Sequence, residues 1–171
     1  MSNILITYFS ASGVTARVSQ NIADKIGADT FEIRPKKRYT DADLNWHDKN
    51  SRSSIEMENK SSRPEIEGTV SKLTDYSIVM IGFPVWWYTA PTIINTFIES
   101  LDLTGKILIP FCTSGGTGIE GCENDLKKAY PKYIWKKGKR LTGREDKEFL
   151  ENWILEWDKF GKSKKIFKRI K

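Results

Sequence analysis

Three hydroxyl side chains and one glycine lie close together near the start of the chain, in residues 8–15. Ser10, Ser12 and Thr15 supply hydroxyl groups, and Gly13 lets the backbone approach a ligand closely. An apolar run precedes this segment and a helical pattern follows it. Backbone N–H groups at a helix start have no intrahelical partner and suit a phosphate or another anion. Because Ser and Thr are also preferred at an ordinary helix N-cap, the segment alone leaves both interpretations open.

Three consecutive aromatic residues form a second unusual segment. Trp86, Trp87 and Tyr88 follow the apolar run 78–81 and precede Pro91, which suits the first turn of a helix. One of the three rings can belong to the core, but three in a row after a buried strand cannot all point inward easily. We therefore expect the exposed rings to stack on a flat aromatic ligand.

A third segment, residues 113–118, follows another apolar run and contains three glycines that expose backbone N–H and C=O groups. All three segments follow predicted strands. In an open parallel sheet, ligands bind beyond the carboxyl ends of the strands, where the strand order reverses. A phosphate site at one end and a planar ring at the other describe a mononucleotide cofactor.

Alternating apolar and amphipathic patterns predict an α/β fold with a parallel sheet in a three-layer sandwich. The predicted strands are residues 3–9, 29–34, 76–82, 106–113 and 133–137. The predicted helices are residues 15–26, about 41–54, 69–73, 91–101, 119–129 and 144–160. Residues 36–68 show no clear strand, and the length of this polar segment favours a mobile cover.

The length of 171 residues predicts one domain with a substantial core. No apolar run is long enough to span a membrane, and the first residues lack the pattern of a signal peptide. The two cysteines form no disulfide pattern, so a reduced, cytoplasmic protein is expected.

The net charge of +6 belongs to the C-terminal end. Residues 162–171 hold six Lys and Arg and no acid; removing these from the total of 28 leaves 22, which equals the 22 Asp and Glu. The rest of the chain is therefore formally neutral. We expect a domain at residues 1–161, a basic tail at residues 162–171 and no nucleic-acid partner.

The chain resembles the flavodoxins in three segments. Their phosphate loop, S/T-x-T/S-G-x-T, is similar to Ser10-Ala11-Ser12-Gly13-Val14-Thr15. The segment G-Y/F-P-x-W-W-x-x-A-P of a flavodoxin-like family is similar to residues 82–91, and its P-F-x-T-S-G-G segment is similar to residues 110–116. Order and spacing agree from residue 1 to about residue 161. The resemblance implies the flavodoxin-like fold, a five-stranded parallel sheet of order 2-1-3-4-5 and non-covalent FMN.

Carried over by position, the resemblance also implies three groups of cofactor-binding residues. The FMN phosphate would be held by Ser10, Ala11, Ser12, Gly13, Val14 and Thr15. One side of the isoalloxazine would be lined by Pro84, Val85, Trp86, Trp87 and Tyr88. The ring edge and ribityl chain would contact Thr113, Ser114, Gly115 and Gly116.

The chain departs from the family pattern at two places. Val14 stands where many relatives have Asn, which removes a polar side chain but no backbone donor. Residues 113–121 hold no aromatic residue, whereas electron-carrier flavodoxins commonly stack a Tyr over the second flavin face there. That face is expected to be open or covered by residues 36–68.

Because FMN would perform the redox chemistry, no catalytic acid, base or nucleophile is expected. One histidine and two cysteines are too few for a His-based metal site or a structural zinc, so no metal site is expected. His47 lies in a polar stretch and is expected to be solvated. Cys112 and Cys122 are expected to be packing residues, and a redox role for Cys122 stays open as the less favoured interpretation.

Two classes of function are consistent with these residues. In the first, FMN passes electrons from NAD(P)H or a partner reductase to a small acceptor such as a quinone, or to a partner protein. In the second, the chain is a non-enzymatic flavin-binding interaction module. Residues 82–91 and 113–119 contain no acid, so little negative charge opposes full reduction of the flavin, which favours a reductase over a one-electron carrier.

Overall fold

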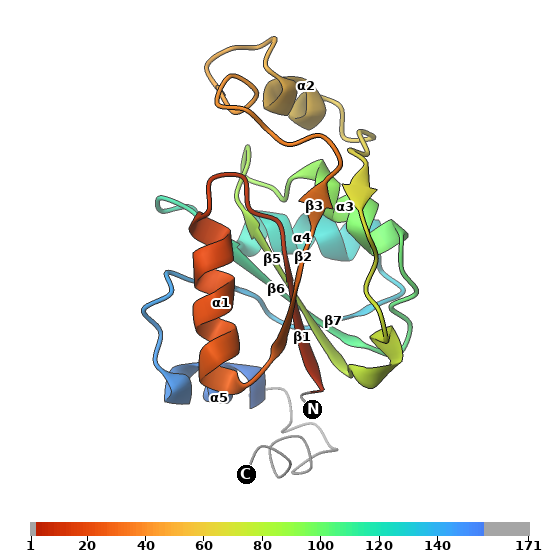
Figure 1. The fold of residues 1–171 in the computed structure, drawn as a ribbon, viewed down its shortest axis with the longest axis vertical. Helices are drawn as coiled ribbons and strands as arrows, with labels where there is room; N and C mark the ends of the chain where they lie inside the picture. The colour runs from red at the N-terminus through yellow and green to blue at the C-terminus, as the bar shows by residue number, and fades with distance from the viewer. Residues whose placement is uncertain (1–2, 156–171) are drawn as a thin grey trace.

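A computed structural model describes residues 3–155 and has one main parallel sheet (Figure 1). Its order is β2-β1-β5-β6-β7, and β8 also pairs with β6. The strands are β1 (Ile4–Tyr8), β2 (Asp29–Glu32), β5 (Ile78–Pro84), β6 (Ile107–Thr113), β7 (Ile134–Trp135) and β8 (Lys139–Arg140). The first four predicted strands are confirmed to within two residues at their ends, in the predicted order.

The predicted fifth strand, residues 133–137, needs correction because the sheet has two short strands there. β7 pairs with the first half of β6, and β8 pairs with its second half, at Phe111 and Cys112. Pro110 lies between the two paired stretches and has no N–H to donate to a neighbouring strand. The ladder is therefore interrupted beside Pro110, and the sheet has six strands instead of five.

Helices cover both faces of the sheet, which confirms the three-layer prediction (Figure 1). α1 (Val14–Ile26) and α5 (Lys147–Leu155) pack on one face, against alternate strand residues such as Ile6 and Met80. α3 (Thr92–Glu99) and α4 (Glu120–Ala129) pack on the other face, against Leu5 and Val79. The predicted residues 156–160 of the last helix, and the predicted tail, lie outside the described residues. Within residues 3–155, none of the helices has the length and apolar character needed to cross a bilayer.

Residues 36–65, called the excursion here, lie beyond the carboxyl ends of the central strands (Figure 1). Two short antiparallel strands, β3 (Arg34–Pro35) and β4 (Ile66–Glu67), close its base. The expectation of no strand in residues 36–68 is therefore wrong at β4. The predicted helix at residues 69–73 is also wrong, because only a 3₁₀ turn, η1 (Leu73–Asp75), forms beside it.

The predicted helix at residues 41–54 is replaced by turns and a later helix, α2 (Arg52–Glu58). Short polar side chains explain the difference, because they bind nearby backbone N–H groups and compete with helix formation. Thr40 and Asp43 exchange such bonds at 2.9 and 3.1 Å, and Asp48 accepts one from the N–H of Asn50 at 2.9 Å. The helix begins only after Ser51, whose side chain caps it by accepting from the N–H of Ser54.

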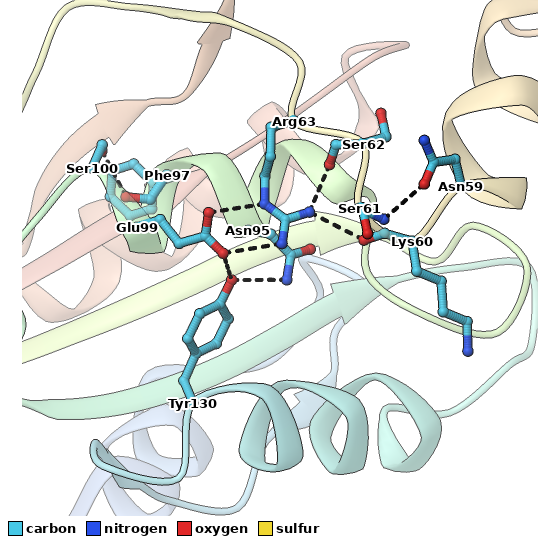
Figure 2. A network of polar contacts seen from close by, with 10 residues as sticks. All are labelled: Asn59, Lys60, Ser61, Ser62, Arg63, Asn95, Phe97, Glu99, Ser100 and Tyr130. Carbon is cyan, nitrogen blue, oxygen red and sulfur yellow. Dashed lines mark hydrogen bonds and ion pairs between the residues drawn. The ribbon is translucent and has the colours of Figure 1, made fainter.

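A polar network fastens the C-terminal end of the excursion, close to β4, to α3 (Figure 2). The Arg63 guanidinium makes two bonds to the Glu99 carboxylate, at 2.9 Å from Nε and 3.0 Å from Nη2. Tyr130 donates its hydroxyl to the same carboxylate at 2.7 Å, and Asn95 donates to the Tyr130 oxygen at 3.0 Å. The hydrogen bond from Arg63 lowers the pKa of Glu99. Mobility of this segment stays a prediction, and these contacts favour a fixed wall.

We expect Arg63→Ala to loosen the excursion without unfolding the domain. The Arg63–Glu99 pair is partly exposed, so its loss is expected to cost at most about 1 kcal/mol of global stability. Amide hydrogen exchange in residues 59–65 is expected to accelerate, since the bonds from Arg63 to the Lys60 and Ser62 carbonyls disappear as well. Lys147→Ala removes a comparable surface ion pair with Glu151 on α5 and serves as the control. Unchanged exchange in residues 59–65, or an equal effect of both variants, would contradict this role.

Candidate functional site

The loops after β1, β5 and β6 meet at one edge of the sheet and are joined through Thr113. The Thr113 hydroxyl lies 2.8 Å from the Thr15 hydroxyl at the start of α1. The Thr113 carbonyl accepts from the Val85 N–H at 3.0 Å, in the loop after β5. Because Thr15 and Thr113 are both buried, these bonds fix the three loops relative to one another.

The predicted cofactor residues differ in exposure at this edge. Exposed are Ser12, Gly13, Val14, Trp87, Tyr88, Gly115 and Gly116. Half-buried are Ser10, Ala11, Pro84, Val85, Trp86 and Ser114. Thr15 and Thr113 are buried and serve the framework, so the exposed group carries most of the surface that a ligand could touch.

The first loop presents a helix start that no side chain caps. The N-cap residue of α1 is Gly13, with φ of 89°, so the interpretation as an ordinary Ser or Thr N-cap is wrong. The Ser10 hydroxyl instead accepts from the Gly13 N–H at 3.1 Å and shapes the turn. A Cβ added to Gly13 would meet no protein atom within 4 Å. The first turn of α1 contains no acid, so the open space beside it favours an anion.

The aromatic segment forms a tight turn in which only the first ring is packed inward. Trp86 and Thr89 exchange two backbone hydrogen bonds of 3.0 Å. Trp86 lies edge-on to Phe9, with ring centroids 5.6 Å apart, whereas Trp87 is 45% exposed and Tyr88 76% exposed. The expected division into one core ring and two exposed rings is confirmed.

This turn is strained and is held by the start of α4. Trp87 and Tyr88 have φ of 47° and 64°, a region that costs non-glycine residues roughly 1–3 kcal/mol each. The Thr89 hydroxyl donates to the Asp125 carboxylate at 2.6 Å. Gly121 lies so close that an added Cβ would stand 2.6 Å from the Tyr88 carbonyl oxygen. The strained backbone of the turn is therefore held in place by α4.

Both cysteines are buried. Burial raises the pKa of the Cys112 thiol and of the Cys122 thiol to about 12 each, so both stay protonated near neutral pH. The Cys122 thiol lies 3.8 Å from the Tyr88 carbonyl, to which it donates a weak hydrogen bond. The prediction that both are packing residues is confirmed. His47 is exposed, as predicted, and its ring stacks on Trp46 with centroids 3.5 Å apart.

The glycine loop after β6 is held by a residue that the sequence did not reveal. Arg140 on β8 donates from Nε to the Ser114 hydroxyl at 3.0 Å and from Nη2 to the Ser114 carbonyl at 3.0 Å. The Ser114 hydroxyl in turn donates to the Thr117 carbonyl. Gly115 and Gly116 are exposed, and no other described residue bonds to their N–H groups. No sequence signal pointed to Arg140, because a two-residue strand has no periodic pattern.

The excursion forms a wall beside the aromatic turn through Tyr39, also missed from sequence. Its ring centroid lies 5.5 Å from that of Trp86 and 5.7 Å from that of Phe9. The Arg52 guanidinium stacks 3.9 Å from the Tyr39 ring, and the Tyr39 hydroxyl donates to Glu56 at 2.5 Å. Burial and this bond to Glu56 raise the pKa of Tyr39. The wall is therefore built from mutually paired polar groups. Within residues 3–155, no cluster of side chains could hold a metal ion.

We expect Gly121→Ala to displace the aromatic turn. Alanine is favoured over glycine by up to about 1 kcal/mol in a helix, but here its methyl group meets backbone that cannot move freely. A net loss of roughly 1–3 kcal/mol is expected from this overpacking, with changed amide chemical shifts in residues 86–89. Gly116→Ala is the control, because an added Cβ there meets nothing within 4 Å. An increase in thermal stability of the Gly121 variant would show that the turn adapts.

Comparisons with known proteins agree on one family. The family model for flavodoxin matches residues 3–157. A candidate flavoprotein from Bacteroides eggerthii DSM 20697 is 44% identical, with a TM-score of 0.87, over 92% of this chain and 98% of that chain. Another from Bacteroides uniformis ATCC 8492 is 47% identical, with a TM-score of 0.83, over 90% and 97%.

A more distant likeness concerns the fold alone. The flavoprotein from Lactobacillus acidophilus NCFM, solved in complex with FMN, is 22% identical, with a TM-score of 0.71, over 90% of this chain and 99% of that chain. No curated protein matches the chain. The family model and the two Bacteroides structures nevertheless cover nearly all described residues at high similarity, and the chain belongs to the flavodoxin family.

Proposed function

We propose that this chain binds FMN non-covalently at the three joined loops and uses it to pass electrons. The observation that carries the proposal is the junction at Thr113, which brings an uncapped helix start, two exposed aromatic rings and a glycine loop to one edge. FMN needs all three features, because it has a phosphate at one end and a planar ring at the other. The complex of the L. acidophilus relative with FMN supports the same assignment.

The exposed groups of the three loops match the parts of FMN. Beside Gly13 there is room for the phosphate, and Ser12, Val14 and Thr15 offer N–H groups at the positive end of α1. Trp87 and Tyr88 are exposed and can offer ring surface to the isoalloxazine, whereas Trp86 is packed against Phe9. The N–H groups of Gly115 and Gly116 can donate to polar atoms at the ring edge. All proposed contacts with FMN lie in the proposed domain, residues 1–161, and none lies in the basic tail.

FMN supplies the redox chemistry, and the protein supplies binding, orientation and exclusion of water. NAD(P)H or a partner reductase is the proposed donor, and a small molecule such as a quinone or a partner protein is the proposed acceptor. Residues 82–91 and 113–119 contain no acid, which favours this two-electron reductase role, and two of the three acids that follow are engaged. Glu123 is paired with Lys127 at 2.6 Å, and Asp125 accepts from Thr89. Little uncompensated negative charge therefore opposes reduction.

Absorbance and turnover of the purified protein test this function. We expect a yellow protein whose released cofactor is FMN, and steady-state reduction of a quinone by NADH or NADPH without added protein. Turnover that requires an added reductase would identify a carrier. Bound flavin without turnover in either assay would favour the alternative, a non-enzymatic flavin-binding module. A colourless protein that does not quench the fluorescence of added FMN would contradict the proposal.

The phosphate site is tested by Gly13→Val, which places a branched side chain in the open space beside the helix start. Loss of one charge-assisted hydrogen bond at about 1.5–3 kcal/mol is expected to weaken FMN binding by on the order of tenfold or more. Gly105→Val is the matched control. Gly105 has φ of 75°, also has no atom within 4 Å of an added Cβ, and precedes β6 at the opposite edge. Both variants carry similar backbone strain, but only the first is expected to lose FMN affinity in a fluorescence titration. Equal binding of riboflavin and FMN by the unmodified protein would rule out the phosphate site.

A further inference from the structure

One cationic side chain lies directly on the glycine loop. β8 pairs with the end of β6 with Cys112 opposite Arg140, so the guanidinium reaches the loop just after Thr113. Besides the two bonds described above, its Nε lies 3.3 Å from the Ser114 carbonyl oxygen. This fork of donors holds the planar group in one orientation, as a flexible ammonium would not.

The charge of Arg140 is not neutralised by a direct partner within residues 3–155. None of the ion pairs among these residues includes it. The carboxylate of Glu120 turns back to Gly118, at the other end of the loop. The end of the loop that includes Ser114 is therefore the positive end.

On the basis of the proposed function, we propose that Arg140 is a positioning residue that raises the reduction potential of bound FMN. Two-electron reduction with uptake of one proton adds one negative charge to the isoalloxazine. The proposed site has residues 113–116 at the ring edge, so a guanidinium bonded to Ser114 stabilises that charge. Oxidised FMN has a neutral ring and gains less from the same cation. Arg140 therefore favours the reduced cofactor over the oxidised one.

Three variants of the full chain separate charge from geometry. Arg140→Gln removes the charge and keeps donor groups, and Arg140→Lys keeps the charge and removes the fork. Lys139→Gln is the matched control, since it removes the neighbouring charge on β8, where Lys139 Nζ lies 5.5 Å from the Phe149 ring centroid. Each protein is loaded with FMN and reduced anaerobically with dithionite in the presence of an indicator dye of known potential.

The potential of Arg140→Gln is expected to fall, with a roughly tenfold loss of preference for reduced over oxidised FMN, or about 30 mV for a two-electron couple. Arg140→Lys is expected to keep most of the original potential, and Lys139→Gln all of it. An unchanged potential in flavin-loaded Arg140→Gln would overturn the inference, as would an equal fall in the Lys139 variant. An equal fall in Arg140→Lys, or loss of oxidised FMN by both Arg140 variants, would assign Arg140 a purely structural role and also overturn it. Failure of the unmodified chain to bind FMN would instead contradict the proposed function, so the two failures are distinguishable.

Discussion

The site depends on the buried contact between the hydroxyls of Thr15 and Thr113. Thr15 lies in the first turn of α1, on one face of the sheet, and Thr113 is the last residue of the central strand β6. The Thr113 carbonyl also accepts a hydrogen bond from the Val85 N–H, so the loop after β5 is held at the same point. A buried hydroxyl that loses its partner costs roughly 1–3 kcal/mol, which disfavours independent movement of any one loop. The two ends of a cofactor bound here would therefore be held by parts of the chain that share one fixed point.

The aromatic turn after β5 adds a second constraint, because its backbone is strained. Two aromatic residues in the left-handed region persist only where surrounding contacts determine them. Here the contacts come from α4, through Asp125, Gly121 and Cys122. Packing alone would place these rings in the core, yet Tyr88 is more than three quarters exposed. A turn that keeps apolar rings in solvent at a conformational cost is readily understood as a ligand surface held in advance of binding.

Most of the fold could be predicted because the central strands are buried on both faces, and continuous apolar runs such as residues 78–81 are typical of strands in that position. The same reasoning identified the three loops, since each follows such a run. It failed in residues 41–54, where Thr40, Asp43 and Asp48 bind local backbone instead of allowing a helix. Arg140 could not be found, because its contact with Ser114 spans 26 positions and depends on a two-residue strand.

The excursion shows how polar groups can be buried beside an apolar ligand surface. Tyr39 contributes a ring to the wall, and its hydroxyl would be costly there without a partner. The Glu56 carboxylate accepts a hydrogen bond from that hydroxyl. Arg52 forms an ion pair with Glu56 at 2.7 Å, and its guanidinium also stacks on the ring of Tyr39. The polar groups of Tyr39, Arg52 and Glu56 therefore have partners within this group. The part of the group that contacts Trp86 and Phe9 is the uncharged ring of Tyr39. Arg140, on β8, by contrast brings a positive charge to Ser114 at the start of the glycine loop.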